Sequence, residues 1–183
     1  MTPEVIAWAT AHIRRGEVYQ HTILEVGSAD INGSLRPWLE HFSPRSYIGT
    51  DIAPGPGVDL VLPAEQLTYH FGERRFDLVV STEMLEHAEH WRDAVWNMMA
   101  VTAPGGLMIV TTRSPGFPRH DWPSDHWRFT IEDFFWIWAG WDIQRLDSDP
   151  QLPGVFLRVR KPDGWDPDFA RARLDRLTVI AAP

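Results

Sequence analysis

A glutamate and two glycines near the start of the chain have the spacing of a ligand-binding turn. Residues 22–33 read as an apolar strand that carries Glu25, stops at Gly27 and turns through small and polar residues to Gly33. A glycine has no Cβ, so the backbone there can approach a ligand closely. Ser34 follows as a suitable N-cap for a helix. A strand, a tight turn and a helix N-terminus in this order predict a cofactor-binding loop.

A second acid stands at the end of the next predicted strand. Residues 46–51 form that strand, and Asp51 is its last residue. An acid about 20 residues after a glycine turn is placed to accept hydrogen bonds from ribose hydroxyls. Asp51 meets that spacing from Gly27, which predicts a ligand that contains a nucleoside.

The turn between the two acids argues against a dinucleotide. A pyrophosphate-binding turn reads G-x-G-x-x-G, and here Ala29 and Asn32 stand at the second and third glycine positions. Asp30 adds negative charge where a pyrophosphate would lie, which is repulsive. Glu25 and Asp30 together favour a cationic ligand.

Composition narrows the class of protein. With 183 residues, 44% hydrophobic and 23% charged, we expect one globular domain over residues 1–183. The absence of cysteine excludes disulfides and thiolate metal sites. The net charge of −8 disfavours nucleic acid as a partner. No apolar run reaches the ~18 residues of a membrane span and no signal peptide is visible, so we expect a cytoplasmic protein with no membrane contact. Nothing in the sequence specifies an oligomeric state.

Strand and helix patterns alternate along the chain. This alternation predicts an α/β fold with a doubly wound, mostly parallel, seven-stranded sheet and an antiparallel strand near the C-terminus. Ligands of such sheets bind at the carboxyl ends of the strands, where Gly27, Asp51, Ser81 and Thr112 would form one rim. Strands are predicted at 22–27, 46–51, 58–62, 76–81, 107–112, 141–147 and 155–161. One helix is predicted to begin at Pro3. The other helices are predicted to span 34–42, 64–71, 90–102, 130–139 and 167–177.

Four segments together resemble the class I S-adenosylmethionine-dependent methyltransferases. They are residues 23–28, 47–51, 76–87 and 104–110, and the most specific is 76–87, with the sequence FDLVVSTEMLEH. The resemblance covers about residues 20–130 and implies a Rossmann-like fold with S-adenosylmethionine as cofactor, bound by residues 20–112. Residues 113–183 then form the lid and the acceptor side. The chain departs from the family pattern at Ala29, Ile31 and Pro63.

The resemblance implies a set of cofactor-binding residues. Glu25 lies near the donor's ammonium group, Asp51 binds the ribose and Ile52 packs on the adenine. The Ala64 backbone amide or the Glu65 side chain contacts the adenine. Purely structural roles stay open for both acids: Glu25 could cap the end of its strand, and Asp51 could form a turn. The full set is Glu25, Gly27, Ser28, Asp51, Ile52, Ala64, Glu65, Ser81, Thr82 and Glu83.

Candidate catalytic residues are histidines near the predicted rim. His120 and His126 lie in a polar and aromatic segment, 118–130, that resembles a loop closing over the site in some small methyltransferases. Either could act as a general base, and His87 is a further candidate with a structural alternative. His120, Asp121, Asp125 and His126 have metal-binding side chains, but their spacing alone fixes no geometry, and we predict no metal site.

The same segment holds candidate lid and substrate residues. Asp125, Trp127 and Arg128 are the residues singled out. One interpretation is a lid held by Arg128 paired to Asp125 or Asp121, with Trp122 and Trp127 packed beneath it. The other is that Arg128 binds a carboxylate or phosphate of the substrate.

These observations predict methyl transfer to an O or N atom of a small-molecule acceptor. The acceptor pocket is expected to come from the N-terminal helix, the 113–129 loop and the C-terminal tail. A base is needed only when the acceptor atom carries a proton at neutral pH. A macromolecular acceptor also stays open, because a short lid leaves an open rim. Two rival functions remain: a partner protein that keeps the fold and has lost transfer, and a nicotinamide-dependent oxidoreductase, which the turn sequence disfavours.

Overall fold

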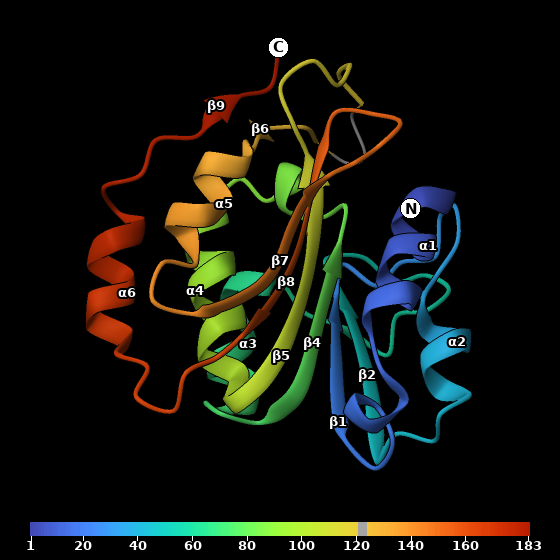
Figure 1. The fold of residues 1–183 in the computed structure, drawn as a ribbon. Helices are drawn as coiled ribbons and strands as arrows, with labels where there is room; N and C mark the ends of the chain where they lie inside the picture. The colour runs from blue at the N-terminus through green and yellow to red at the C-terminus, as the bar shows by residue number, and fades with distance from the viewer. Residues whose placement is uncertain (121–123) are drawn as a thin grey trace.

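The computed structural model describes residues 1–120 and 124–183, and a seven-stranded sheet forms its centre (Figure 1). Its strands are β1 (Thr22–Val26), β2 (Ser46–Asp51), β3 (Leu60–Val61), β4 (Phe76–Thr82), β5 (Thr102–Arg113), β7 (Asp142–Ser148) and β8 (Gly154–Arg160). They are ordered β3-β2-β1-β4-β5-β8-β7. The first five are parallel, and β8 runs antiparallel to both β5 and β7. The predicted fold class is confirmed.

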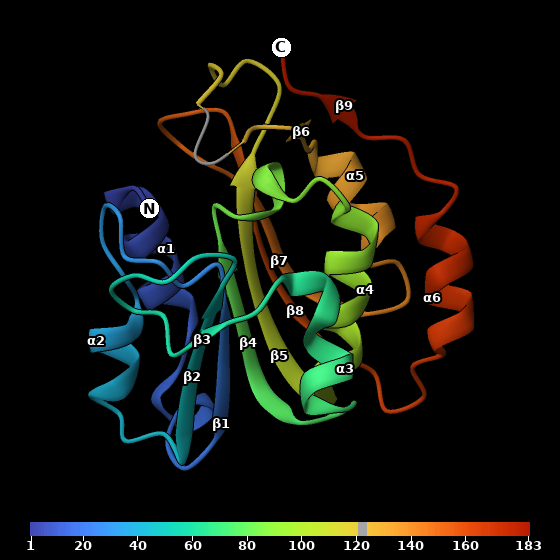
Figure 2. The same ribbon diagram turned by 180° about the vertical axis from the view of Figure 1, so that it is seen from behind.

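Helices cover both faces of this sheet (Figure 1, Figure 2). One face carries α1 (Pro3–His12) and α2 (Arg36–Glu40), and the other carries α3 (Leu67–Phe71), α4 (Trp91–Val101) and α5 (Ile131–Ile137), with α6 (Pro167–Leu174) packed on α4. Short 3-10 turns are η1 (Arg15–Glu17), η2 (Ala64–Gln66) and η3 (Leu85–His87). None of the helices in the described part of the chain has the length and apolar character needed to cross a bilayer.

Burial on both faces explains why the strands read as apolar runs. Ile23 and Leu24 are fully buried in β1 and belong to the two different cores, one on each side of the sheet. Val79 and Val80 divide between the cores in the same way in β4. A parallel sheet covered by helices on both faces selects such residues at every position.

The pairing of β1 with β2 sets the position of the predicted turn. Glu25 lies opposite Gly49, and Val26 lies opposite Thr50. The Gly27 amide then donates to the Thr50 carbonyl at 2.8 Å. Gly27 and Asp51 therefore leave their strands side by side at the same edge of the sheet.

Several element boundaries differ by a few residues from the sequence prediction, and two of the differences have a visible cause. The helix expected over 34–42 is α2, and Leu35 holds its N-cap position without a side-chain bond. Ser34 still contributes, since its hydroxyl accepts from the Arg36 amide at 3.0 Å. β5 begins at Thr102 because that residue pairs with Phe76, and the Pro-Gly-Gly segment that follows forms an irregularity inside the strand.

A second, two-stranded sheet joins the C-terminal tail to the predicted lid. β6 (Trp127–Arg128) and β9 (Ile180–Ala181) pair antiparallel, and the Ala182 amide donates to the His126 carbonyl at 2.8 Å. Trp127 and Arg128, at the end of the predicted lid, therefore have a strand partner that is distant in the sequence.

The single lysine of the chain ties β8 to the end of α4. The Lys161 side chain is buried, and its ammonium donates to the carbonyls of Met99 at 2.6 Å and Thr102 at 2.7 Å. It also lies 4.0 Å from the centre of the Trp165 ring. A cation at a helix C-terminus satisfies carbonyls that have no helical partner.

We expect Lys161→Met to lower the free energy of unfolding by about 2–3 kcal/mol, because it leaves buried carbonyls unpaired. Urea denaturation followed by circular dichroism measures this change. Arg176→Met removes a cation from an exposed position and is the matched control. Equal midpoints for the two variants would contradict the capping role of Lys161.

Candidate active site

A large cavity opens at the carboxyl ends of β1, β2 and β4. Its volume is about 1160 Å³, and it is lined by residues of the glycine turn, of the segments after β2, β3 and β4, of the N-terminus and of the 113–126 loop. This is the edge at which doubly wound sheets bind ligands.

The glycine turn is held by a close backbone contact and by a carboxylate. Gly27 has a φ of +78°, and a Cβ at this position would lie 2.6 Å from the Met84 side chain. The Asp51 carboxylate accepts from the Ala29 amide at 3.1 Å and lines the cavity. The carboxylate thus faces the turn and the open cavity.

Glu25 is a buried acid at the cavity wall. The Tyr47 hydroxyl donates to its carboxylate at 2.6 Å. Burial raises the pKa of Glu25 to about 7, even though that hydrogen bond favours the charged form. With a pKa near 7, Glu25 is only partly ionised at neutral pH and is well suited to gain charge when a cation binds beside it.

The segments after β2 and β3 supply an apolar and a polar wall. Ile52 is 55% exposed and lines the cavity, so its side chain is available to pack on a ligand. Ala64 and Glu65 line the cavity next to it. Ser28 also lines it, and its hydroxyl is buried without a protein partner.

The end of β4 brings Thr82 and Glu83 to the cavity. Glu83 has a φ of +56°, a left-handed conformation that is costly for a residue with a Cβ. Its carboxylate accepts from the Thr111 hydroxyl at 3.0 Å and forms an ion pair with the buried Arg113. Ser81 was predicted to belong to this group, but it is fully buried within β4 and does not line the cavity.

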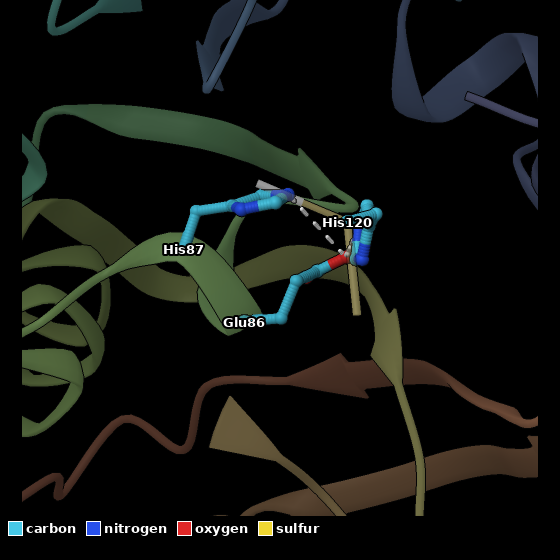
Figure 3. A group of neighbouring side chains, drawn as sticks. All are labelled: Glu86, His87 and His120. Atoms are coloured by element: carbon cyan, nitrogen blue, oxygen red, sulfur yellow. Dashed lines mark ion pairs between the residues drawn. The ribbon is translucent and has the colours of Figure 1, made fainter. Parts of the chain in front are cut away.

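Two histidines and a glutamate meet at the other end of the cavity (Figure 3). The Glu86 Oε1 atom lies 3.8 Å from His120 Nε2 and 4.0 Å from His87 Nε2. Burial raises the pKa of Glu86 to about 7, and burial together with the nearby His87 lowers the pKa of His120. His87, His120 and His126, the three predicted catalytic histidines, all line the cavity.

The predicted lid is held by a buried ion pair. Arg128 donates to both carboxylate oxygens of Asp125, and further to the carbonyls of Trp127 and Pro118. Arg128 is 1% exposed and does not line the cavity. The interpretation of Arg128 as a substrate-binding cation is therefore wrong, because its donors are already taken by the lid itself.

The other lid residues also act within the protein. The Trp127 indole donates to the Ala88 carbonyl at 2.9 Å, and Asp125 accepts from the His120 amide at 2.9 Å. Asp125 and Trp127 do not line the cavity. Asp121 and Trp122 lie outside the described residues. The C-terminal tail, expected to line the acceptor pocket, contributes no cavity-lining residue among those described and instead braces the lid.

Sequence reasoning missed three contributors to the site. Met84 packs against Gly27, and Arg113 forms an ion pair with Glu83. Glu86 lies between two histidines. The signal for Glu86 was its position directly before His87, after a strand that ends at the rim. The pairing with His120 could not be read from the sequence, because 33 intervening residues include a full helix and strand.

Comparison with known proteins assigns the family. Residues 10–146, more than half of the chain, match the model of a family described as "Methyltransferase domain". The chain belongs to this methyltransferase family. The match and the fold confirm the resemblance to class I enzymes, for which S-adenosylmethionine is the cofactor. A search of curated proteins found no significant match to this chain.

Solved structures with the same fold are similar at low sequence identity. Burkholderia thailandensis 1,6-didemethyltoxoflavin-N1-methyltransferase, with bound 1,6-didemethyltoxoflavin and S-adenosylhomocysteine, is 15% identical, with a TM-score of 0.66 over 87% of this chain and 79% of that one. A Mesorhizobium loti S-adenosylmethionine-dependent methyltransferase is 16% identical, with a TM-score of 0.64 over 85% and 98%. A Haloferax volcanii methyltransferase in complex with the Trm112 activator is 14% identical, with a TM-score of 0.66 over 89% and 90%.

We expect Gly27→Ala to destabilise the methyltransferase and to weaken binding of S-adenosylhomocysteine. An alanine in the left-handed region costs about 1–2 kcal/mol, and its Cβ would collide with Met84. The melting temperature should fall by about 2–8 °C in a domain of this size. Gly16→Ala is the matched control, because a Cβ there meets nothing within 4 Å. Similar melting temperatures for both variants would show that the turn is not constrained.

Proposed function

We propose that the protein transfers the methyl group of S-adenosylmethionine to an O or N atom of a small-molecule acceptor. The observation that carries this proposal is the cavity with the glycine turn at one end and the histidines at the other. The family fixes the class of reaction, and the cavity suggests how its two ends are used.

Charge and shape at the turn suit the methyl donor. The Asp51 carboxylate is held by the Ala29 amide and retains lone pairs for ribose hydroxyls. Ile52 offers an apolar surface for the adenine, and Glu25 offers a carboxylate for the ammonium group. Thr82 and Glu83 then border the methionine portion.

Transfer itself is an in-line displacement at the methyl carbon. A bond forms between the acceptor atom and the methyl group, the sulfur–methyl bond breaks, and a neutral thioether leaves. The protein must mainly align the two reactants and exclude water. Any proton on the acceptor atom leaves at the histidine end of the cavity, where His87, His120 and His126 lie.

The size of the cavity supports a small acceptor. Ligand sites usually occupy about 300–1000 Å³, and 1160 Å³ is room for the donor and a compact organic molecule. The net charge of −8 disfavours a nucleic acid acceptor. The Burkholderia thailandensis enzyme, with bound 1,6-didemethyltoxoflavin, offers a precedent for a small acceptor on this fold.

We expect the unmodified protein to bind S-adenosylhomocysteine saturably at micromolar concentration. We expect Asp51→Ala to abolish this binding. The substitution removes the carboxylate that meets the ribose and also frees the Ala29 amide. Isothermal titration calorimetry measures the binding. Asp163→Ala, at an exposed position outside the cavity, is the control. No binding to the unmodified protein at millimolar ligand would favour the alternative, a partner protein that has lost transfer.

We further expect the affinity for S-adenosylhomocysteine to rise with pH through about 7. Below that pH the Glu25 carboxyl carries a proton and does not attract the ligand's ammonium group; above it the carboxylate does. Binding at pH 6 should be about tenfold weaker than at pH 8. Glu25→Gln should bind weakly with little dependence on pH. An unchanged pH dependence in that variant would exclude Glu25 as the ammonium partner.

A further inference from the structure

The histidine end of the cavity has the donor atoms of a metal site. Glu86 Oε1, His87 and His120 present ligand atoms that all lie within 4.8 Å of one another. In Figure 3 the Glu86 carboxylate points toward both imidazole rings. The donors come from η3, directly after β4, and from the loop after β5, so two neighbouring strands of the sheet position them.

Glu86 carries the observation that points to a ligand. Its side chain is completely buried, and its Oε2 atom accepts from the Thr112 hydroxyl at 2.8 Å. Its Oε1 atom has no hydrogen-bond partner and faces the two histidines. A buried carboxylate oxygen without a partner is costly, and a cation placed between Oε1 and the imidazoles would remove that cost.

In each histidine, Nδ1 faces a protein oxygen and Nε2 faces Glu86, as in metal-binding histidines. His87 Nδ1 contacts the Ser124 carbonyl, which can only accept, so this nitrogen carries the proton and Nε2 keeps its lone pair. His120 Nδ1 lies 3.1 Å from Asp125 Oδ2 in ion-pair contact, without the geometry of a hydrogen bond, and its Nε2 lies 3.8 Å from Glu86 Oε1. Carbonyl or carboxylate partners of this kind fix the tautomer and direction of metal-bound histidines.

We propose that Glu86, His87 and His120 bind a divalent transition-metal ion, of the class of Zn²⁺ or Fe²⁺. Two imidazole nitrogens with one carboxylate oxygen suit these ions better than Mg²⁺ or Ca²⁺. Bonds of about 2.0–2.2 Å place neighbouring ligands of a tetrahedral ion about 3.4 Å apart. The two Glu86–imidazole separations are 3.8 and 4.0 Å and the ligand atoms all lie within 4.8 Å of one another, so binding an ion requires the widest pair to close by up to about 1.4 Å, through rotation of the imidazole side chains.

The site also narrows the class of acceptor, a step that rests on the proposed function. Three protein ligands leave a coordination position open toward the cavity that the histidines line. A hydroxyl bound there has its pKa lowered by the ion and releases its proton to solvent. Its oxygen then takes the methyl group as the sulfur–methyl bond breaks. The acceptor is therefore a small molecule with a metal-binding hydroxyl group.

The test is a titration of the metal-free protein with Co²⁺, followed by visible absorption and by calorimetry, without methyl donor or acceptor. We expect one Co²⁺ per chain, displaced by Zn²⁺. Glu86→Gln and His120→Ala should weaken binding by about 100-fold or more. His126→Ala is the matched control, because His126 lines the cavity outside the cluster. Circular dichroism establishes that each variant is folded.

Two results would overturn the inference: no saturable Co²⁺ binding up to about 1 mM, or equal affinity in the His120→Ala variant and the unmodified protein. The His120 side chain is 36% exposed, so we expect the His120→Ala variant to fold even if Glu86→Gln, at a fully buried position, does not. Since the titration uses the metal alone, its failure leaves binding of S-adenosylhomocysteine untouched. Loss of S-adenosylhomocysteine binding would, in turn, leave the metal result standing.

Discussion

The site depends on the contact between the Asp51 carboxylate and the glycine turn. Parallel pairing of β1 and β2 brings Gly27 beside Thr50, and the carboxylate of the next residue then accepts from the Ala29 amide. That hydrogen bond fixes both the direction of the acid and the shape of the turn. The positive φ of Gly27 against Met84 allows the turn to lie this close to the neighbouring segment. The crevice between the two strands is a consequence of this geometry.

The two ends of the cavity differ in chemistry, and in the proposed function this difference orders the reactants. Glu25 and Asp51 make the strand end acidic, which suits a cationic nucleoside and repels a pyrophosphate. His87 and His120, with Glu86 between them, make the other end suitable for a metal ion or a proton. The lid contributes through the Asp125–Arg128 pair, which holds the loop and orients His120 without entering the cavity.

Features that depend on local pattern were predictable from the sequence, and features that depend on distant partners were not. The strands, the glycine turn and the rim position of Asp51 follow from buried apolar runs and from spacing. Arg128 was open to two interpretations, since only the fold shows that Asp125 and nearby carbonyls take its donors. Glu86 was hidden for the same reason, because His120 reaches it from another loop. Ser81 was misplaced because a residue one position before the strand end still lies within the sheet.

The most direct test of this account is a crystal structure of the protein with S-adenosylhomocysteine. The account predicts that both ribose hydroxyls lie within about 2.6–3.2 Å of the Asp51 carboxylate, with the adenine on Ile52 and the ammonium group at Glu25. A nucleoside found elsewhere, or an Asp51 carboxylate turned out of the crevice in the complex, would contradict it.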